Sequence, residues 1–179
     1  MRKKWLALAL SLTMVAGCLT GCGGSDSTTS NTNSGSSSND SAKVETLADG
    51  GGKVLNIYVW NDEFSSRFEK YYPDYDKSTK SIGDVKVNFI QNANEGNNYQ
   101  DKLDAALKAQ DSASADDKVD MFLCEMDYVN KYTNTDKALD VKALGLTDED
   151  MSQMYDYTKQ AATGVDGVLR GVSWQGCPG

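Results

Sequence analysis

The sequence contains no histidine, only two prolines and fewer basic than acidic residues, and the missing residue types exclude several functions. Without histidine the chain has no His-based catalytic triad and none of the usual histidine-bearing metal sites. With 18 basic and 26 acidic residues, its formal net charge is −8, which argues against nucleic acid as a partner. We therefore expect no enzymatic activity, no metal and no cofactor.

Apolar residues at the N-terminus form a stretch, Trp5 to Ala16, that is too short to span a bilayer as a permanent helix. A basic patch, Arg2 to Lys4, precedes this stretch, and small residues follow it. That order is typical of a secretory signal peptide and disfavours the alternative of a buried helix. We predict that residues 1–21 are a signal peptide and take no part in the fold.

Two cysteines, Cys18 and Cys22, each end a lipobox, the pattern of small residues before a cysteine that receives a diacylglyceryl group. We favour Cys22 because it leaves a fuller apolar segment before the cleavage site and because a polar tract begins directly after it. Cys18 is the alternative. Several acyl chains on one cysteine hold a protein on a membrane, where a single chain is marginal. We predict a lipoprotein anchored at the extracellular face of a bacterial cell membrane.

A flexible tether is predicted for residues 22–52, because positions 23–41 contain only Gly, Ser, Thr, Asn and Asp. Such a composition has no apolar surface to bury and so cannot offset the entropy lost on ordering. A coil of this length has a root-mean-square reach of about 30 Å. The folded part is therefore expected at residues 53–179.

The folded part is predicted to be α/β, because strand and helix patterns alternate along it. Continuous β-branched and aromatic residues indicate a buried strand at 54–60, and alternation indicates further strands at 85–89 and 119–124. Apolar residues at helical spacing predict helices at about 62–72, ended by Pro73, and at about 99–107. This order predicts a parallel-sheet core with flanking helices.

The second half of the folded part gives weaker patterns. They predict a short helix at 128–132, a helix that begins at Thr147 with an approximate capping box and continues to about Thr158, and a tight turn at 165–168. A last strand is predicted from about Val168 to Trp174.

Polar and aromatic side chains follow the first and third predicted strands, where ligands of a parallel sheet collect. Trp60, Asn61 and Glu63 follow the first strand, and Glu125 and Asp127 follow the third. Aromatic faces stack on sugar rings, and carboxylates and amides bind hydroxyl groups, so this set suits a polyhydroxylated ligand.

Each of these residues also has a purely structural interpretation. Asn61 can cap the following helix, Glu63 suits its first turn, and Trp60 can belong to the core. Glu125 and Asp127 can cap the short helix at 128–132. Paired carboxylates such as Glu63 and Asp127 also leave a secreted glycosidase open as a minor hypothesis.

Three segments, residues 55–73, 119–132 and 171–179, together with the lipobox and the tether, make the chain resemble the extracellular solute-binding lipoproteins of ABC importers, especially the carbohydrate-binding group. The resemblance implies a two-lobed periplasmic-binding-protein-like fold that closes on a sugar. Such a protein is not an enzyme, and it delivers the sugar to permease subunits in the membrane. It also implies that Trp60, Glu63, Asp127 and Trp174 line the cleft, and that the protein is a monomer.

The chain ends soon after Trp174, about where the resemblance places the first crossing to a second lobe. The expectation is therefore an apparently truncated N-terminal lobe with weak sugar binding, because one wall of the cleft would be missing. An acidic surface lipoprotein that acts as an interaction module is the alternative. We expect Cys124 and Cys177 to be two unpaired thiols.

Overall fold

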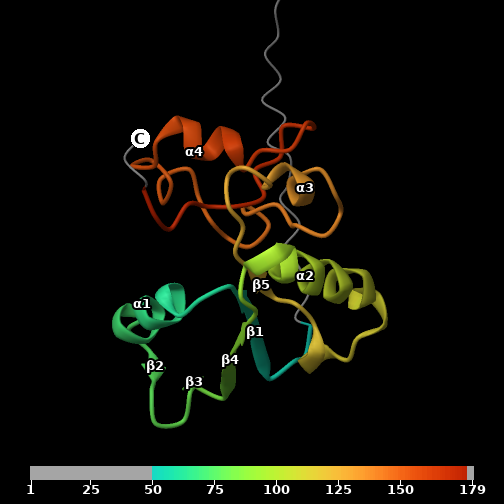
Figure 1. Cartoon of the computed structure of the whole chain (residues 1–179). Coiled ribbons are helices and arrows are strands. Elements are labelled where there is room, and N and C mark those ends of the chain that lie inside the picture. The colour runs from blue at the N-terminus through green and yellow to red at the C-terminus, as the bar shows by residue number, and fades with distance from the viewer. Residues whose placement is uncertain (1–49, 177–179) are drawn as a thin grey trace, which may run out of the picture. The chain divides into compact units, whose positions relative to one another are not determined.

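The structure is a computed structural model that describes residues 50–176. The predicted signal peptide, Cys22, most of the tether and Cys177 lie outside the described residues. Five strands and four helices are found in the described part (Figure 1). They are β1 (Val54–Val59), α1 (Glu63–Tyr71), β2 (Tyr75–Asp76), β3 (Ser81–Ile82), β4 (Val85–Gln91), α2 (Asn98–Ala109), β5 (Met121–Phe122), α3 (Asn130–Thr133) and α4 (Asp156–Ala161).

The strands form one mixed sheet with the order β2-β3-β4-β1-β5. β1 lies between β4 and β5 and pairs with both in parallel, whereas β2, β3 and β4 pair antiparallel. The α/β prediction is therefore confirmed, but the purely parallel sheet is wrong. β2 and β3 were not predicted because two-residue strands are too short to show an alternating pattern.

Apolar side chains cover both faces of β1, which explains its continuous apolar sequence. Ile57 and Val59 are fully buried on the face that packs against Phe64 and Phe68 of α1. Tyr58 packs on the opposite face, against the core formed by α2. Burial of each large apolar side chain contributes about 1.5–3 kcal/mol. These two clusters hold β1 at the centre of the fold.

The carboxyl ends of β1 and β5 are tied together by Tyr99 of α2. Its hydroxyl donates to the carbonyl oxygen of Leu123 at 2.6 Å and lies 3.1 Å from the carbonyl oxygen of Tyr58. The side chain is fully buried. Burial raises the pKa of the Tyr99 hydroxyl well above its usual range, so it remains a neutral donor.

Near the other end of β1, buried Asn56 fixes the loop that leads to β5. Its side-chain amide donates to the carbonyl oxygens of Asp116 at 2.8 Å and Lys118 at 2.9 Å, and its backbone N–H donates to the Asp120 carboxylate at 2.8 Å. A buried amide needs such partners. The short β5 is therefore positioned by side-chain contacts as well as by strand pairing.

The helix predicted from Thr147 does not form as expected. The capping-box hydrogen bonds are present, since the Thr147 N–H donates to the Asp150 carboxylate at 2.8 Å, but the following residues form turns and α4 begins only at Asp156. Tyr155 has extended backbone angles, which interrupts the helix. Met151 is buried while Tyr155 is largely exposed, so the segment presents no single apolar helical face.

The predicted last strand from Val168 to Trp174 is also wrong. An isolated antiparallel bridge joins Thr163 and Leu169, and no strand follows in the described residues up to 176. The predicted tight turn is present, with Gly167 in the left-handed region at a φ of 80°. Leu169 has Thr163 as its bridge partner, and the residues after it pair with no described strand, so they remain irregular.

Candidate ligand-binding site

The order of the parallel strands defines where a ligand would bind. β1 connects through α1 to β4, and β4 connects through α2 to β5 on the other side of β1. The two helices pack on opposite faces of the sheet, and the strand order reverses between β1 and β5. In α/β sheets, such a switch point opens a crevice at the carboxyl ends of the strands.

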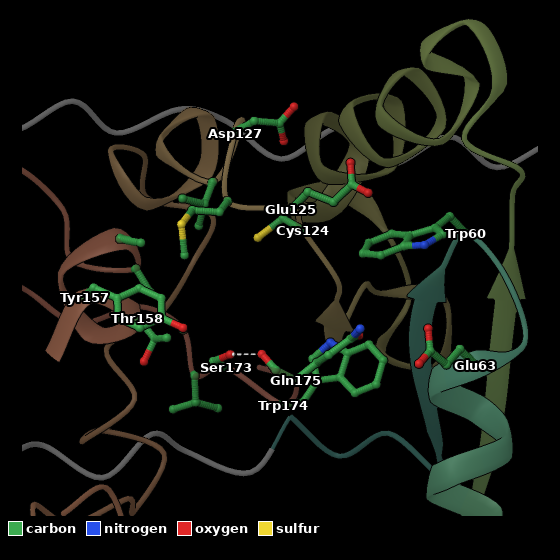
Figure 2. Close-up of a pocket in the computed structure, with 16 residues that line it drawn as sticks. Trp60, Glu63, Cys124, Glu125, Asp127, Tyr157, Thr158, Ser173, Trp174 and Gln175 are labelled. Carbon is green, nitrogen blue, oxygen red and sulfur yellow. Dashed lines mark hydrogen bonds between the residues drawn. The ribbon is translucent and has the colours of Figure 1, made fainter. Parts of the chain in front are cut away.

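A cavity of about 730 Å³ lies at this position. Trp60, which follows β1, and Cys124 and Glu125, which follow β5, contribute one wall. The opposite wall comes from α4, and residues 171–175 complete the lining, with Trp174 packed against Phe64 of α1. Figure 2 shows these side chains around a common space, with Trp60 and Glu63 on one side and Tyr157 and Thr158 on the other. The volume suits a small-molecule ligand.

Most of the site residues predicted from the sequence come together here. The structure places Trp60, Glu63, Glu125, Asp127 and Trp174 in the lining. Asn61 is not part of the lining, and its side-chain oxygen accepts the backbone N–H of Glu63 at 3.0 Å. Asn61 therefore forms a local turn next to the N-terminus of α1, whose N-cap is Asp62 and not Asn61.

Two indole rings of the cavity are held in place by aromatic neighbours. Trp60 meets Tyr99 edge to face, with ring centroids 5.4 Å apart, and Trp174 meets Phe64 in the same way at 5.3 Å. Edge-to-face pairs are favourable because a ring edge is positive and a ring face is negative. Trp60 thus belongs to the core and to the cavity at the same time.

Glu63 occupies the side of the cavity formed by α1. Arg67, one helical turn further along, donates to its carboxylate at 3.0 Å, and the Arg67 guanidinium lies 6.0 Å from the ring centre of Trp174. The charge of Glu63 is therefore compensated within the protein by a partly exposed ion pair. Figure 2 shows the carboxylate directed toward the central space.

Glu125 and Asp127 form an acidic rim at the edge of the cavity, and both are exposed. The only hydrogen bond between described side chains at this rim is a long one of 3.4 Å from the Asn94 amide to Glu125. Neither carboxylate forms an ion pair within residues 50–176. No side chain caps α3, so their predicted capping role is not observed.

Several lining residues were not predicted as site residues. They are Cys124, Met126, Val129, Tyr157, Thr158, Ala161, Ala162, Gly171, Val172, Ser173 and Gln175. Ser173 and Gln175 flank Trp174 in one of the segments that carry the family resemblance, so their position was a usable signal. Tyr157 and Thr158 lie on α4, whose extent was predicted wrongly, and nothing in the sequence linked them to the strand ends.

Cys124 lines the cavity as an uncharged thiol. It is a free cysteine in the described part of the chain, and burial raises the pKa of its thiol to about 11. At neutral pH the group thus behaves as a small apolar side chain. Cys177, which was also predicted to be unpaired, lies outside the described residues.

Residues 50–176 carry neither a metal-binding cluster nor a membrane-spanning helix. That part of the chain holds no group of three or more Cys, Asp and Glu side chains arranged to bind a metal ion. None of its helices combines the length and the apolarity needed to cross a bilayer.

Comparisons of the chain with models of protein families, with curated proteins and with solved structures gave no match.

Proposed function

We propose that the protein is a solute-binding protein that captures a carbohydrate in the cavity between β1 and β5. The observation that carries this proposal is the pair of fixed indole rings, Trp60 and Trp174, in a cavity that also holds carboxylate, hydroxyl and amide groups. Ring faces of sugars stack on such aromatic surfaces, and their hydroxyl groups need acceptors and donors nearby.

The polar groups of the cavity are suited to bind hydroxyl groups. Glu63 offers a carboxylate, while Thr158, Ser173 and Gln175 offer hydroxyl and amide groups. The Ser173 hydroxyl donates to the carbonyl oxygen of Gln175 at 2.7 Å, which orders this short segment (Figure 2). A few polar groups in a largely apolar cavity fix the orientation of a ligand.

The wider proposal is that a lipid on Cys22 anchors the protein at the outer face of the cell membrane, where it delivers an oligosaccharide to the permease subunits of an ABC transporter. This part is supported by the signal peptide, the lipobox, the tether and the family resemblance. In that setting a second lobe would close over the cavity and exclude water from the ligand.

The test is a titration of the processed chain, beginning at residue 22 with serine in place of the acylated cysteine, against a panel of oligosaccharides. Saturation-transfer NMR is suited to the weak binding expected of an open cavity. We expect signals from at least one sugar, and a loss of up to about ten-fold in affinity for Trp60→Ala and for Trp174→Ala, because each aromatic face contributes on the order of 1 kcal/mol.

The matched control is Tyr71→Ala, which removes an aromatic side chain that is 67% exposed and does not line this cavity. It should leave binding unchanged. Absence of any sugar signal, or equal binding by all of these variants, would contradict the proposal. Turnover of a chromogenic glycoside that disappears in Glu63→Gln would support the glycosidase alternative instead.

A further inference from the structure

The charges of the cavity are of one sign. Its lining contains the carboxylates of Glu63, Glu125 and Asp127, and no lysine or arginine. Glu63 is compensated by Arg67 at 3.0 Å, which leaves the acidic rim, Glu125 and Asp127, as the uncompensated charge.

Basic side chains on the neighbouring helices are engaged elsewhere. Lys131 of α3 pairs with Asp104 at 2.6 Å, and Lys159 of α4 pairs with Asp156 at 3.0 Å. Nothing among residues 50–176 therefore supplies a cation to the rim. The two rim carboxylates face solvent and the cavity, so a cationic group on a ligand in the cavity would be the nearest positive charge to them.

We propose that the cavity selects a saccharide that carries protonated amines, such as an oligomer of glucosamine, over its neutral and anionic counterparts. This inference rests on the proposed function and names the substrate class of the same site. The sugar rings would stack on Trp60 and Trp174, while an ammonium group would meet the acidic rim.

Two physical effects favour such a ligand. An ammonium group attracts the rim carboxylates, and it also interacts favourably with the face of an indole ring. A neutral sugar leaves Glu125 and Asp127 as two neighbouring like charges, and a sugar acid adds a third. Because the rim is exposed, each ion pair contributes modestly, and the two together predict a preference of roughly ten-fold.

The experiment compares a glucosamine oligomer with the N-acetylated oligomer of the same length, at mildly acidic pH, where the free amines are protonated. The two ligands share the ring skeleton and differ in charge. The same titrations are repeated with Glu125→Gln, Asp127→Asn and the double variant, at low and at high salt.

We expect the free-amine oligomer to bind roughly ten-fold more tightly, and this preference to fall by about three-fold in each single variant. High salt should reduce it as well, because exposed charges are screened. The control variant is Asp74→Asn, which removes an exposed acid that does not line the cavity and should leave the preference unchanged.

Three other outcomes would overturn the inference, and they differ in what they say about the proposed function. Equal or tighter binding of the acetylated oligomer would contradict the charge selection and leave carbohydrate capture standing. A preference that survives in the double variant would assign it to the overall negative charge of the chain. If neither oligomer nor any neutral sugar binds, both proposals fail.

Discussion

The wall of the cavity that carries Trp60 and Cys124 stands at the ends of paired strands, whereas the wall that carries Tyr157 and Thr158 belongs to a segment with one short helix and one isolated bridge. The first wall is continuous with the two apolar clusters that cover the sheet. Tyr157 and Thr158 of the second wall belong to neither cluster, and polar contacts of Arg170 support the segment that carries them. The comparison suggests that the two walls can be perturbed separately.

Arg170 provides much of the polar support for the second wall. Its guanidinium donates to both carboxylate oxygens of Asp166, at 2.7 and 2.6 Å, and to the carbonyl oxygen of Thr133 at 3.1 Å. Its side chain is only 16% exposed. A two-pronged pair of this kind is strong and directional, so it fixes the bridge between Thr163 and Leu169 relative to α3.

The largest expected effect is a loss of stability in Leu103→Ala, which alters the apolar cluster that supports the first wall. Leu103 of α2 is fully buried, and removal of such a side chain costs about 2–5 kcal/mol because a cavity remains. Leu139→Ala, at a position that is 48% exposed, is the matched control. Urea denaturation followed by circular dichroism measures the free energy of unfolding. Equal losses in both variants would contradict the assignment of the core.

Gly164→Ala should act next most strongly, and on the second wall. A Cβ atom there would lie 2.5 Å from Nη1 of Arg170 and 2.6 Å from the carbonyl oxygen of Thr133, so the Arg170 contacts must shift. We expect a loss of about 1–3 kcal/mol and weaker ligand binding. Gly176→Ala adds the same methyl group where no described residue other than its chain neighbour lies within 4 Å, and it should be neutral.

Measuring ligand binding separates the effects of Gly164→Ala on the fold and on the site. If the second wall is independent, binding should weaken while α2 and the sheet keep their amide protection in hydrogen exchange. Loss of protection throughout the sheet would mean that both walls form one cooperative unit.

A smaller effect should distinguish two tyrosines near the first wall whose hydroxyl groups are buried. Tyr99→Phe removes the donor to Leu123 and should cost about 1 kcal/mol. The hydroxyl of Tyr128 is buried and has no hydrogen-bond partner among the described residues, so Tyr128→Phe should be neutral or stabilise by up to about 1 kcal/mol. Thermal denaturation should therefore show a lower melting temperature for Tyr99→Phe and an unchanged or higher one for Tyr128→Phe. A larger loss of stability in Tyr128→Phe than in Tyr99→Phe would contradict this prediction.

The smallest expected effect is the pH dependence of the stability that the Asp166–Arg170 pair gives to the second wall. Hydrogen bonds from Arg170, and one from the N–H of Val168, hold the pKa of Asp166 well below its usual range. The stabilisation is therefore complete above the ordinary carboxyl pKa of about 4, and it is lost as the pH falls below that value. The stability difference between the wild type and Asp166→Asn should shrink as the pH is lowered through this range. A difference that grows on acidification would contradict the pair.

The first half of the fold could be predicted from the sequence because its elements are long and strongly patterned. The run at 54–60 and the helical spacing of Phe64 and Phe68 carry their structure in local sequence. The second half could not, because its conformation depends on partners distant in sequence. Arg170 contacts Thr133, and no periodicity reports such a contact.

The site was predictable to the same extent. The rule that ligands bind beyond strand ends predicted that Trp60 and Glu125 lie together, because the rule requires only the positions of the strand ends in the sequence. The structure places both residues in the cavity lining. The polar part of the second wall, with Tyr157 and Thr158, required the three-dimensional arrangement of α4. Asn61 shows the limit of the rule, since a residue at the same sheet edge serves the helix terminus instead.

The placement of the indole rings has a practical consequence. The chain has three tryptophans, of which Trp60 and Trp174 line the cavity and Trp5 lies in the predicted signal peptide. In the processed protein, all intrinsic indole fluorescence would then originate at the site. Emission wavelength and quenching by iodide would report occupancy directly, without an attached dye.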